Sequence, residues 1–275
     1  MIVNLKEILA LAEEGSFAVP AFNVYNTETV MGIFRAAETL RSPVIVQMYS
    51  RLFTSEEAFF VAPSILKAAE SAKVPVCFHL DHGANYDAVA RAVRFGCTGV
   101  MIDASACELE ENIRITKAVA EMCDRLNIPT EGELGHVGMA ADDSMSEFTN
   151  VEEAVRFVKE TGVAALAVMV GTAHGRYKKA PKLDIQRIRD IKNATGLPLV
   201  LHGGSGIPDD QITASIDAGI RKINFGTDVC YSFLDQVFAT DRSEVAIDLF
   251  MKDAVQAVAD FASEKIRLLG SAGRA

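Results

Sequence analysis

The 275-residue sequence lacks any apolar run long enough to span a bilayer, because Gly, Pro or a charged residue interrupts each run within about ten residues. Its N-terminus lacks a basic segment followed by a long apolar one, so we expect no signal peptide. Five scattered cysteines form no Cys-x-x-Cys pair, which favours reduced thiols and a cytoplasmic protein. A net charge of −10 argues against nucleic acid as a partner.

Three of the five histidines share one sequence context. His82, His174 and His202 each follow an apolar, strand-like run, and a glycine comes directly after each of them. One such histidine alone would fit a hydrogen-bonded core residue, but three of them favour a metal site. Three imidazoles with one position left for water or substrate are typical of zinc, and the glycines allow close approach.

Short β-rich runs alternate with amphipathic segments along the whole sequence. We expect strands at residues 18–22, 44–48, 76–80, 99–102, 130–134, 165–170, 199–202 and 222–225. Helical patterns occupy residues 28–40, 55–72, 86–95, 109–126, 151–161, 183–195 and 209–218. Eight strand-helix repeats predict an α/β protein, a (β/α)8 TIM barrel, as a single domain over residues 1–275.

Helices are also expected outside the eight repeats. A first helix, from residue 4 to Gly15, should lie under the barrel as a plug. The segment from Val229 to Arg267 reads as a long C-terminal helical extension that could reach a neighbouring subunit.

Polar side chains mark nearly every predicted strand end, where a barrel builds its active site. They are Asn23, Asp81, Asp103, Glu131, Glu133 and Asn224, besides the histidines. The glycine-rich turn at residues 203–206 and the segment 224–228 each lead into a helix. Loops after strands 7 and 8 that open into helix N-termini predict a phosphate cradle, because free amides face the anion.

A metal beside a phosphate site predicts Lewis-acid chemistry on a phosphorylated ketone or its enediolate. Asp81, next to His82, is suited to move a proton at the hydroxyl of the cleaved C–C bond. A Schiff-base lysine would be the other route, and it needs a lysine inside the barrel. Lys222 lies on a predicted strand, at the amino end and expected far from the site, whereas Lys178 and Lys179 lie in a loop.

Three motifs together carry a family resemblance. They are His-Leu-Asp-His-Gly at residues 79–83, Gly-Thr-Ala-His-Gly at 171–175 and Leu-His-Gly-Gly-Ser-Gly at 201–206. The chain resembles the class II, zinc-dependent fructose-bisphosphate and tagatose-bisphosphate aldolases along nearly its whole length. The resemblance implies one zinc ion per subunit on His82, His174 and His202, with Asp81 as general acid/base and Asn224 steadying the enediolate.

The resemblance also assigns the remaining site residues. Dihydroxyacetone phosphate would be held by Asn23, Gly175, Gly203, Gly204, Ser205, Asn224, Gly226 and Thr227. Asp103 and Glu133 match acids that bind the metal in an alternative state, while His79 and His136 read as structural. The family further implies a homodimer or homotetramer, and it leaves room for a monovalent cation.

Two departures from the family pattern concern the substrate. Ala141 stands where relatives carry a glutamate implicated in proton transfer at the dihydroxyacetone carbon. Asp142 or Asp143 could substitute, or both could be solvated loop acids. After strand 2, Ser50 and Arg51 lie where relatives contact the far end of the sugar. The Arg51 guanidinium suits an anion, or it is a surface arginine.

The substrate therefore stays open between two kinds of ketose 1-phosphate. One is a 1,6-bisphosphate, and the other carries a sulfonated, deoxygenated or carboxylated distal end, as in 6-deoxy-6-sulfofructose 1-phosphate. A zinc hydrolase and a catalytically weakened sugar-phosphate-binding relative remain as further alternatives. A purely structural role is disfavoured, because so many polar groups at strand ends lack a folding reason.

Overall fold

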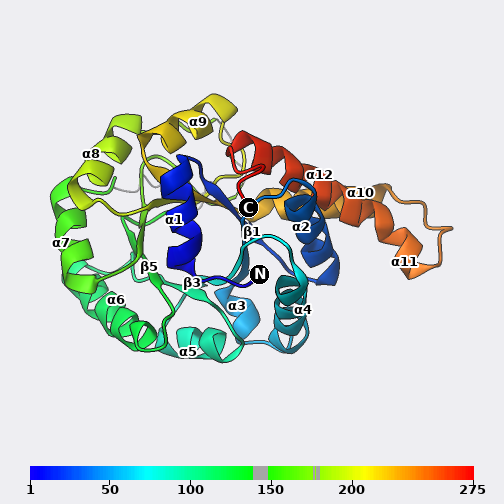
Figure 1. The fold of residues 1–275 in the computed structure, drawn as a ribbon, viewed down its shortest axis with the longest axis horizontal. Coiled ribbons are helices and arrows are strands. Elements are labelled where there is room, and N and C mark those ends of the chain that lie inside the picture. Colours follow the sequence, from blue (N-terminus) through cyan, green and yellow to red (C-terminus); the bar gives the residue numbers. More distant parts are fainter. Residues whose placement is uncertain (139–147, 176, 178–179) are drawn as a thin grey trace.

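Eight parallel strands pair in chain order and close on themselves, with β1 against both β2 and β8 (Figure 1). The structure, a computed structural model, describes residues 1–138, 148–175, 177 and 180–275. The strands are β1 (Val19–Asn23), β2 (Val44–Tyr49), β3 (Val76–Gly83), β4 (Gly99–Ile102), β5 (Thr130–Leu134), β6 (Ala165–Val168), β7 (Leu199–Leu201) and β8 (Ile220–Phe225). The predicted TIM barrel is confirmed.

The strands differ from the prediction mainly at their carboxyl ends. β3 continues through Gly83, three residues beyond the predicted end, because it keeps pairing with β4 after a register shift. β6 and β7 end early, at Val168 and Leu201, since they pair with each other over two residues only. The residues that follow them, His202 included, therefore belong to loops at the barrel mouth.

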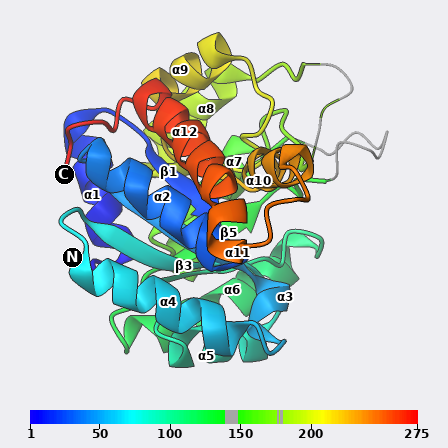
Figure 2. The same cartoon turned by 90° about the vertical axis from the view of Figure 1, so that its right-hand side faces the viewer.

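Helices cover the outside of the barrel (Figures 1 and 2). They are α2 (Thr27–Thr39), α3 (Ser50–Phe53), α4 (Ala58–Ser71), α5 (Tyr86–Arg94), α6 (Leu109–Asp124), α7 (Val151–Thr161), α8 (Ile185–Thr195) and α9 (Asp209–Ala218). Side-chain caps set several starts: Asn85 accepts from the Ala88 amide, and Asp184 accepts from the Arg187 amide. The predicted helix at 55–72 starts later, at Ala58, and the short α3 precedes it.

The first helix, α1 (Leu5–Gly15), closes the amino end of the barrel. A capping box with Asn4 and Glu7 starts it, and its apolar face is fully buried. That face packs on the lower ends of the strands, with Leu5, Ile8, Leu9 and Ala12 against Ala21, Ile45, Cys77, Ala165 and Val200. The predicted plug is confirmed, because this helix covers the amino ends of the strands.

The C-terminal extension is a helical arm that turns back on itself. It consists of α10 (Thr227–Ala239), α11 (Ile247–Phe250) and α12 (Lys252–Leu268), so the helix predicted over 229–267 is interrupted. α12 returns to pack against α2, where a Cβ on Gly32 would lie 2.7 Å from Val258. The ends of α10 and α11 project beyond the barrel (Figure 1).

Candidate active site

Three imidazoles meet at the carboxyl end of the barrel. The ring centroid of His82 lies 4.8 Å from that of His174 and 4.7 Å from that of His202, and the last two are 5.9 Å apart. Each ring offers a nitrogen, and these nitrogens all lie within 4.8 Å of one another. The structure thus brings together three side chains that are up to 120 residues apart in sequence.

A local irregularity of β3 lets neighbouring residues share the mouth. Successive strand residues normally point to opposite faces, but here the β3–β4 register shifts between Leu80 and Gly83. His82 adopts a left-handed backbone with φ of 49°, which is unusual for a residue with a Cβ. Gly83 is required next, since a Cβ there would lie 2.3 Å from the Met101 carbonyl oxygen.

Loop-to-loop hydrogen bonds place the other two histidines. The His174 amide donates to the Gly138 carbonyl at 2.8 Å, which ties the loop after β6 to the loop after β5. The Tyr177 hydroxyl accepts from the Ala173 amide at 2.8 Å and donates to the Gly203 carbonyl at 3.0 Å. Gly203, directly after His202, has φ of 66°, and a Cβ there would lie 2.2 Å from the Ala173 carbonyl oxygen.

The donor set fits a divalent metal ion. Nε2 of His174 and Oε2 of Glu133 are buried without a hydrogen-bond partner in the described part of the chain. Nδ1 of His82 lies 2.7 Å from Oδ2 of Asp103, an arrangement that orients a ligating imidazole. His82, Asp103 and Glu133 form a second cluster of donor atoms beside the three histidines.

The electrostatics of the imidazoles support the same reading. Burial alone would lower the pKa of His82, but Asp81, Asp103 and Glu133 outweigh it and raise that pKa to about 9. Burial and the two other imidazoles lower the pKa of His174 to about 3. In the metal-free protein at neutral pH, His82 therefore keeps a proton. The same three carboxylates that hold this proton would also attract a metal cation.

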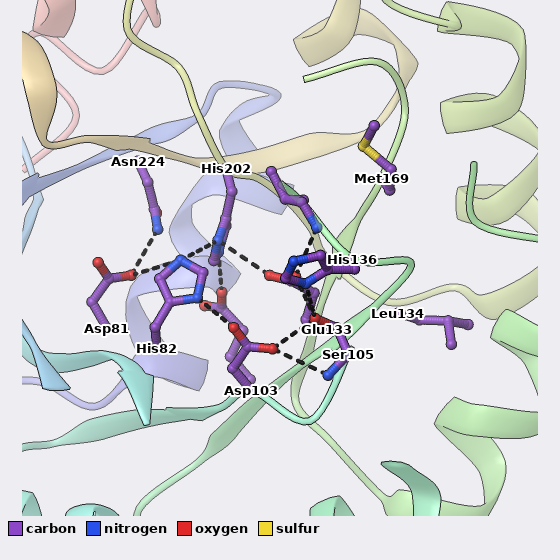
Figure 3. Close-up of polar contacts among 12 residues, drawn as sticks. Asp81, His82, Asp103, Ser105, Glu133, Leu134, His136, Met169, His202 and Asn224 are labelled. Carbon is purple, nitrogen blue, oxygen red and sulfur yellow. Dashed lines mark hydrogen bonds and ion pairs between the residues drawn. The ribbon is translucent and has the colours of Figure 1, made fainter. Parts of the chain in front are cut away.

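Two amides hold the Asp81 carboxylate beside the histidines, and Figure 3 shows one of them, that of Asn224. Nδ2 of Asn23 donates to Oδ2 at 2.8 Å, Nδ2 of Asn224 donates to Oδ1 at 3.1 Å, and Gln47 in turn holds Asn23 at 2.9 Å. Burial alone would raise the pKa of Asp81, but His82, His202 and the amide of Asn23 lower it overall. Asp81 is thus ionised at neutral pH and can accept a proton.

A buried ion pair lies directly beneath the metal cluster. Lys222 was expected far from the site, and that expectation is wrong. Its ammonium is fully buried inside the barrel, 2.8 Å from Oε2 of Glu131, whose other oxygen lies 2.9 Å from Nε2 of His202. His79 is the third member of this layer, 3.6 Å from Glu131. The alternation of strand side chains could have revealed that Lys222 points into the barrel, because Lys222 is two residues before Asn224 and lies on the same face of the strand.

The hydroxyl of Ser105 joins a second group of polar side chains at the mouth (Figure 3). It lies 2.7 Å from Oδ1 of Asp103, 2.9 Å from Oε1 of Glu133 and 3.0 Å from Nδ1 of His136. Burial and the charge of Asp103 raise the pKa of Glu133. Sequence reasoning did not single out Ser105, and it treated His136 as structural.

A cavity of about 560 Å³ opens above the histidines. Most of the predicted site residues line it, namely Asn23, Arg51, Asp81, His82, Asp103, His174, Gly175, Gly203, Ser205, Asn224, Gly226 and Thr227. Tyr25, Tyr49 and His136 also line it and were missed. Tyr25 and His136 lie in the loops after β1 and β5, for which the sequence carried no clear signal, whereas Tyr49 is the last residue of β2 and directly follows the strand predicted at 44–48.

Several predicted residues have other places. Ser50 is buried, and its hydroxyl accepts from the Ala84 amide at 3.3 Å, so it braces the loop after β3 instead of facing the cavity. The Gly204 amide donates to the Asn224 carbonyl at 3.0 Å, which joins the loop after β7 to β8. Ala141, Asp142, Asp143, Lys178 and Lys179 lie outside the described residues.

Comparison with known proteins identifies the family. The model of the family described as Fructose-bisphosphate aldolase class-II matches residues 3–274. The YdjI aldolase from Escherichia coli K12 is 34% identical, with a TM-score of 0.91 and full coverage of both chains. A putative fructose-1,6-biphosphate aldolase from Coccidioides immitis is 28% identical, with a TM-score of 0.91 and coverage of 98% of this chain and 97% of its own.

A third solved structure shares the fold. The fructose-bisphosphate aldolase from Campylobacter jejuni is 20% identical, with a TM-score of 0.84 over 100% of this chain and 97% of its own. The match to the family model spans nearly all of the barrel and its C-terminal arm. The chain therefore belongs to the class II fructose-bisphosphate aldolase family and is an aldolase, a lyase that acts on C–C bonds.

Proposed function

We propose that this aldolase reversibly cleaves a ketose 1-phosphate or 1,6-bisphosphate to dihydroxyacetone phosphate and an aldehyde, with one zinc ion per subunit. One observation carries the proposal. The Asp81 carboxylate, fixed by two amides, lies 3.9 Å from Nε2 of His82 in the three-histidine cluster. A base and a metal site thus face the same cavity, as cleavage next to a carbonyl requires.

His82, His174 and His202 are the residues we assign to the metal. A set of three imidazoles favours zinc over magnesium or calcium, which prefer oxygen ligands. When bound, the ion supplies a Lewis acid that polarises the ketone carbonyl of the substrate. Asp103 fixes the orientation of His82 by its 2.7 Å contact, and Glu131 does the same for His202 at 2.9 Å.

Asp81 is the residue that we assign to take the proton from the substrate hydroxyl that becomes the aldehyde oxygen on cleavage. It is ionised, and both of its oxygens already accept hydrogen bonds from Asn23 and Asn224, which fixes its direction. Oδ1 of Asn224 is buried without a partner in the described residues, so it is free to accept a hydrogen bond from a hydroxyl of the substrate. Together these groups orient the reacting carbons and carry one proton away.

The phosphate of the substrate would lie between the loops after β7 and β8. Gly203, Ser205, Gly226 and Thr227 line this part of the cavity, and α10 begins at Thr227. Backbone amides at a helix start face an anion and attract it through the helix dipole. The Ser205 hydroxyl accepts from the Asp228 amide at 3.2 Å, which joins the loop after β7 to the first turn of α10.

Arg51 supports a second candidate, a substrate whose distal end is an anion other than phosphate. Its guanidinium lies over the Tyr49 ring at 5.1 Å, and both residues line the cavity. No hydrogen bond or ion pair of this guanidinium occurs within the described residues. A planar fork without a protein partner suits a sulfonate, carboxylate or phosphate. We therefore include sulfonated and carboxylated sugars among the substrates, whereas a deoxygenated sugar stays as an alternative that Arg51 does not favour.

A coupled assay for dihydroxyacetone phosphate tests the proposal. Zinc-loaded and chelator-treated enzyme should be compared over fructose and tagatose bisphosphates and over ketose 1-phosphates with sulfonate, deoxy and carboxylate ends. We expect zinc-dependent product with at least one sugar, and loss of turnover but not of zinc in Asp81→Ala. Undiminished turnover of Asp81→Ala would refute its role. Zinc-dependent hydrolysis without aldehyde, or binding without cleavage, would favour the hydrolase and the weakened relative.

We also propose that the enzyme assembles as a homodimer or homotetramer in the cytoplasm. The projecting arm exposes Phe238, Val245 and Ile247, at 83%, 87% and 74% of their surface, and a second copy could cover these apolar side chains. All five cysteines are unpaired, which fits a reducing compartment. Within the described residues, every helix is too short or too polar to cross a bilayer. Sedimentation of wild-type and Phe238→Ser protein tests the assembly.

A further inference from the structure

Cleavage of a ketose phosphate needs two proton transfers, and Asp81 accounts for one of them. When the hydroxyl proton leaves with Asp81, the electron pair of the broken C–C bond remains on a carbon of the three-carbon ketone. That carbon must gain a proton before dihydroxyacetone phosphate leaves, and it must lose one in the reverse direction. A second group that can both give and take a proton should therefore face the cavity.

Most titratable groups at the cavity already have another task. His82 and His174 are assigned to the metal, and Asp103 accepts from both His82 and Ser105 at 2.7 Å. Burial raises the pKa of the Tyr25 and Tyr49 phenols, so both stay protonated at neutral pH and cannot take a proton from the substrate. Among the described residues that line the cavity, His136 is the imidazole left over.

The turn after β5 directs His136 to the cavity. Gly135 has φ of 79°, and a Cβ there would lie 2.8 Å from Oγ1 of Thr149 and 2.9 Å from Cβ of Met169. This packing holds the backbone in a conformation that glycine alone adopts easily. The next residue, His136, is exposed at the cavity wall, and Ser105 holds its Nδ1 at 3.0 Å.

The hydrogen bonds of the Ser105 hydroxyl determine which nitrogen of His136 can face the substrate. The hydroxyl has one proton to donate, and Asp103 and Glu133 present carboxyl oxygens at 2.7 and 2.9 Å. If the hydroxyl donates to Asp103, Nδ1 of His136 satisfies its own contact by donating a proton to the Ser105 oxygen. Nε2 then carries the lone pair and is the nitrogen left for the substrate.

We propose that Nε2 of His136 exchanges the proton of the dihydroxyacetone carbon, an inference that rests on the proposed aldolase function. In cleavage, the protonated imidazole gives its Nε2 proton to that carbon, and the electron pair left by the C–C bond forms the new C–H bond. The neutral imidazole regains a proton from solvent, which reaches its exposed side. In synthesis, the neutral Nε2 removes the same proton.

A partial reaction isolates this step. Zinc-loaded enzyme is mixed with dihydroxyacetone phosphate in D2O, and proton NMR follows the exchange of the hydrogen next to the carbonyl, with no aldehyde present. We expect His136→Gln to slow this exchange about 100-fold or more, because general acid–base catalysis contributes at least that factor. Rapid-quench release of aldehyde in the first turnover should stay unchanged. Added imidazole should restore part of the exchange to His136→Ala.

The outcomes separate this inference from the function on which it rests. If wild-type enzyme releases no dihydroxyacetone phosphate from any sugar, the proposed function fails first. If wild-type enzyme cleaves sugar and His136→Gln exchanges as fast as wild type, Asp81 or another group moves both protons, and the inference alone is wrong. The inference about His136 is also wrong if Asp142→Asn loses the proton exchange while His136→Gln keeps it. It is wrong as well if His136→Gln slows the release of aldehyde in the first turnover as much as it slows the exchange. Zinc content and thermal unfolding show whether each variant is folded.

Discussion

Removal of the Lys222 ammonium should destabilise the barrel strongly. The Nζ atom lies 2.8 Å from Oε2 of Glu131, and both side chains are fully buried. At this distance and an effective dielectric constant of about 20, the attraction is ~6 kcal/mol. Part of that is recovered in Lys222→Met, because the ammonium no longer has to leave water. The carboxylate left behind keeps His202 as a partner, so we expect a net loss of about 3–5 kcal/mol.

The double variant Lys222→Met/Glu131→Gln provides the decisive comparison. It removes both charges but keeps an oxygen that can accept from Nε2 of His202, so most of the loss should be recovered. Urea unfolding followed by circular dichroism measures the free energy of unfolding of each variant. Lys67→Met is the matched control, since its 3.1 Å pair with Glu70 is exposed and should contribute little. A double variant no more stable than Lys222→Met would refute the reasoning.

Two further predictions concern the metal and the phosphate loop. The pKa of His82 is raised to about 9, above its ordinary 6.5, so this group stabilises the metal-free protein below pH 6.5 and stops doing so as the pH rises through 9. Zinc must displace that proton, so zinc affinity should fall about tenfold per pH unit below 9. Calorimetry in two buffers should detect the proton that zinc binding releases. A zinc affinity that does not change between about pH 7 and 8.5 would contradict this prediction. Gly203→Ala should lower both stability and dihydroxyacetone phosphate affinity, because the new Cβ would lie 2.2 Å from the Ala173 carbonyl. Gly162→Ala is its control, with φ of 71° but nothing within 4 Å, and equal losses in the two variants would refute the clash.

The barrel and the histidine cluster could be predicted from the sequence because their signals are local. Parallel strands buried on both faces read as short apolar runs, and each metal-site histidine lies within four residues after the end of a predicted one or at its last residue. Strand ends are also the one place in a barrel where such residues must meet. Their meeting point therefore follows from topology alone, without knowledge of any side-chain contact.

Other features depend on contacts between strands and loops that are distant in sequence. The role of Lys222 depends on Glu131, which reaches it across the barrel from β5. The availability of His136 depends on Ser105, which comes from the loop after β4. Ser50 does not reach the cavity as predicted, for another reason. α3 starts at that residue, so its hydroxyl turns to the Ala84 amide. The alternation along β8 places Lys222 on the inner face of the barrel, but no periodicity in the sequence encodes which partner any of these side chains meets.

The polar interior of the barrel has a charge balance that a divalent cation completes. In the lower layer, Lys222 neutralises Glu131. In the upper layer, the pKa values of Asp81 and Asp103 are lowered, so these two carboxylates place two negative charges beside the histidines. A proton on His82 offsets one of them in the metal-free protein, but a divalent ion offsets both. The carboxylates thus favour the metal, and they do so without occupying the positions that the imidazoles provide.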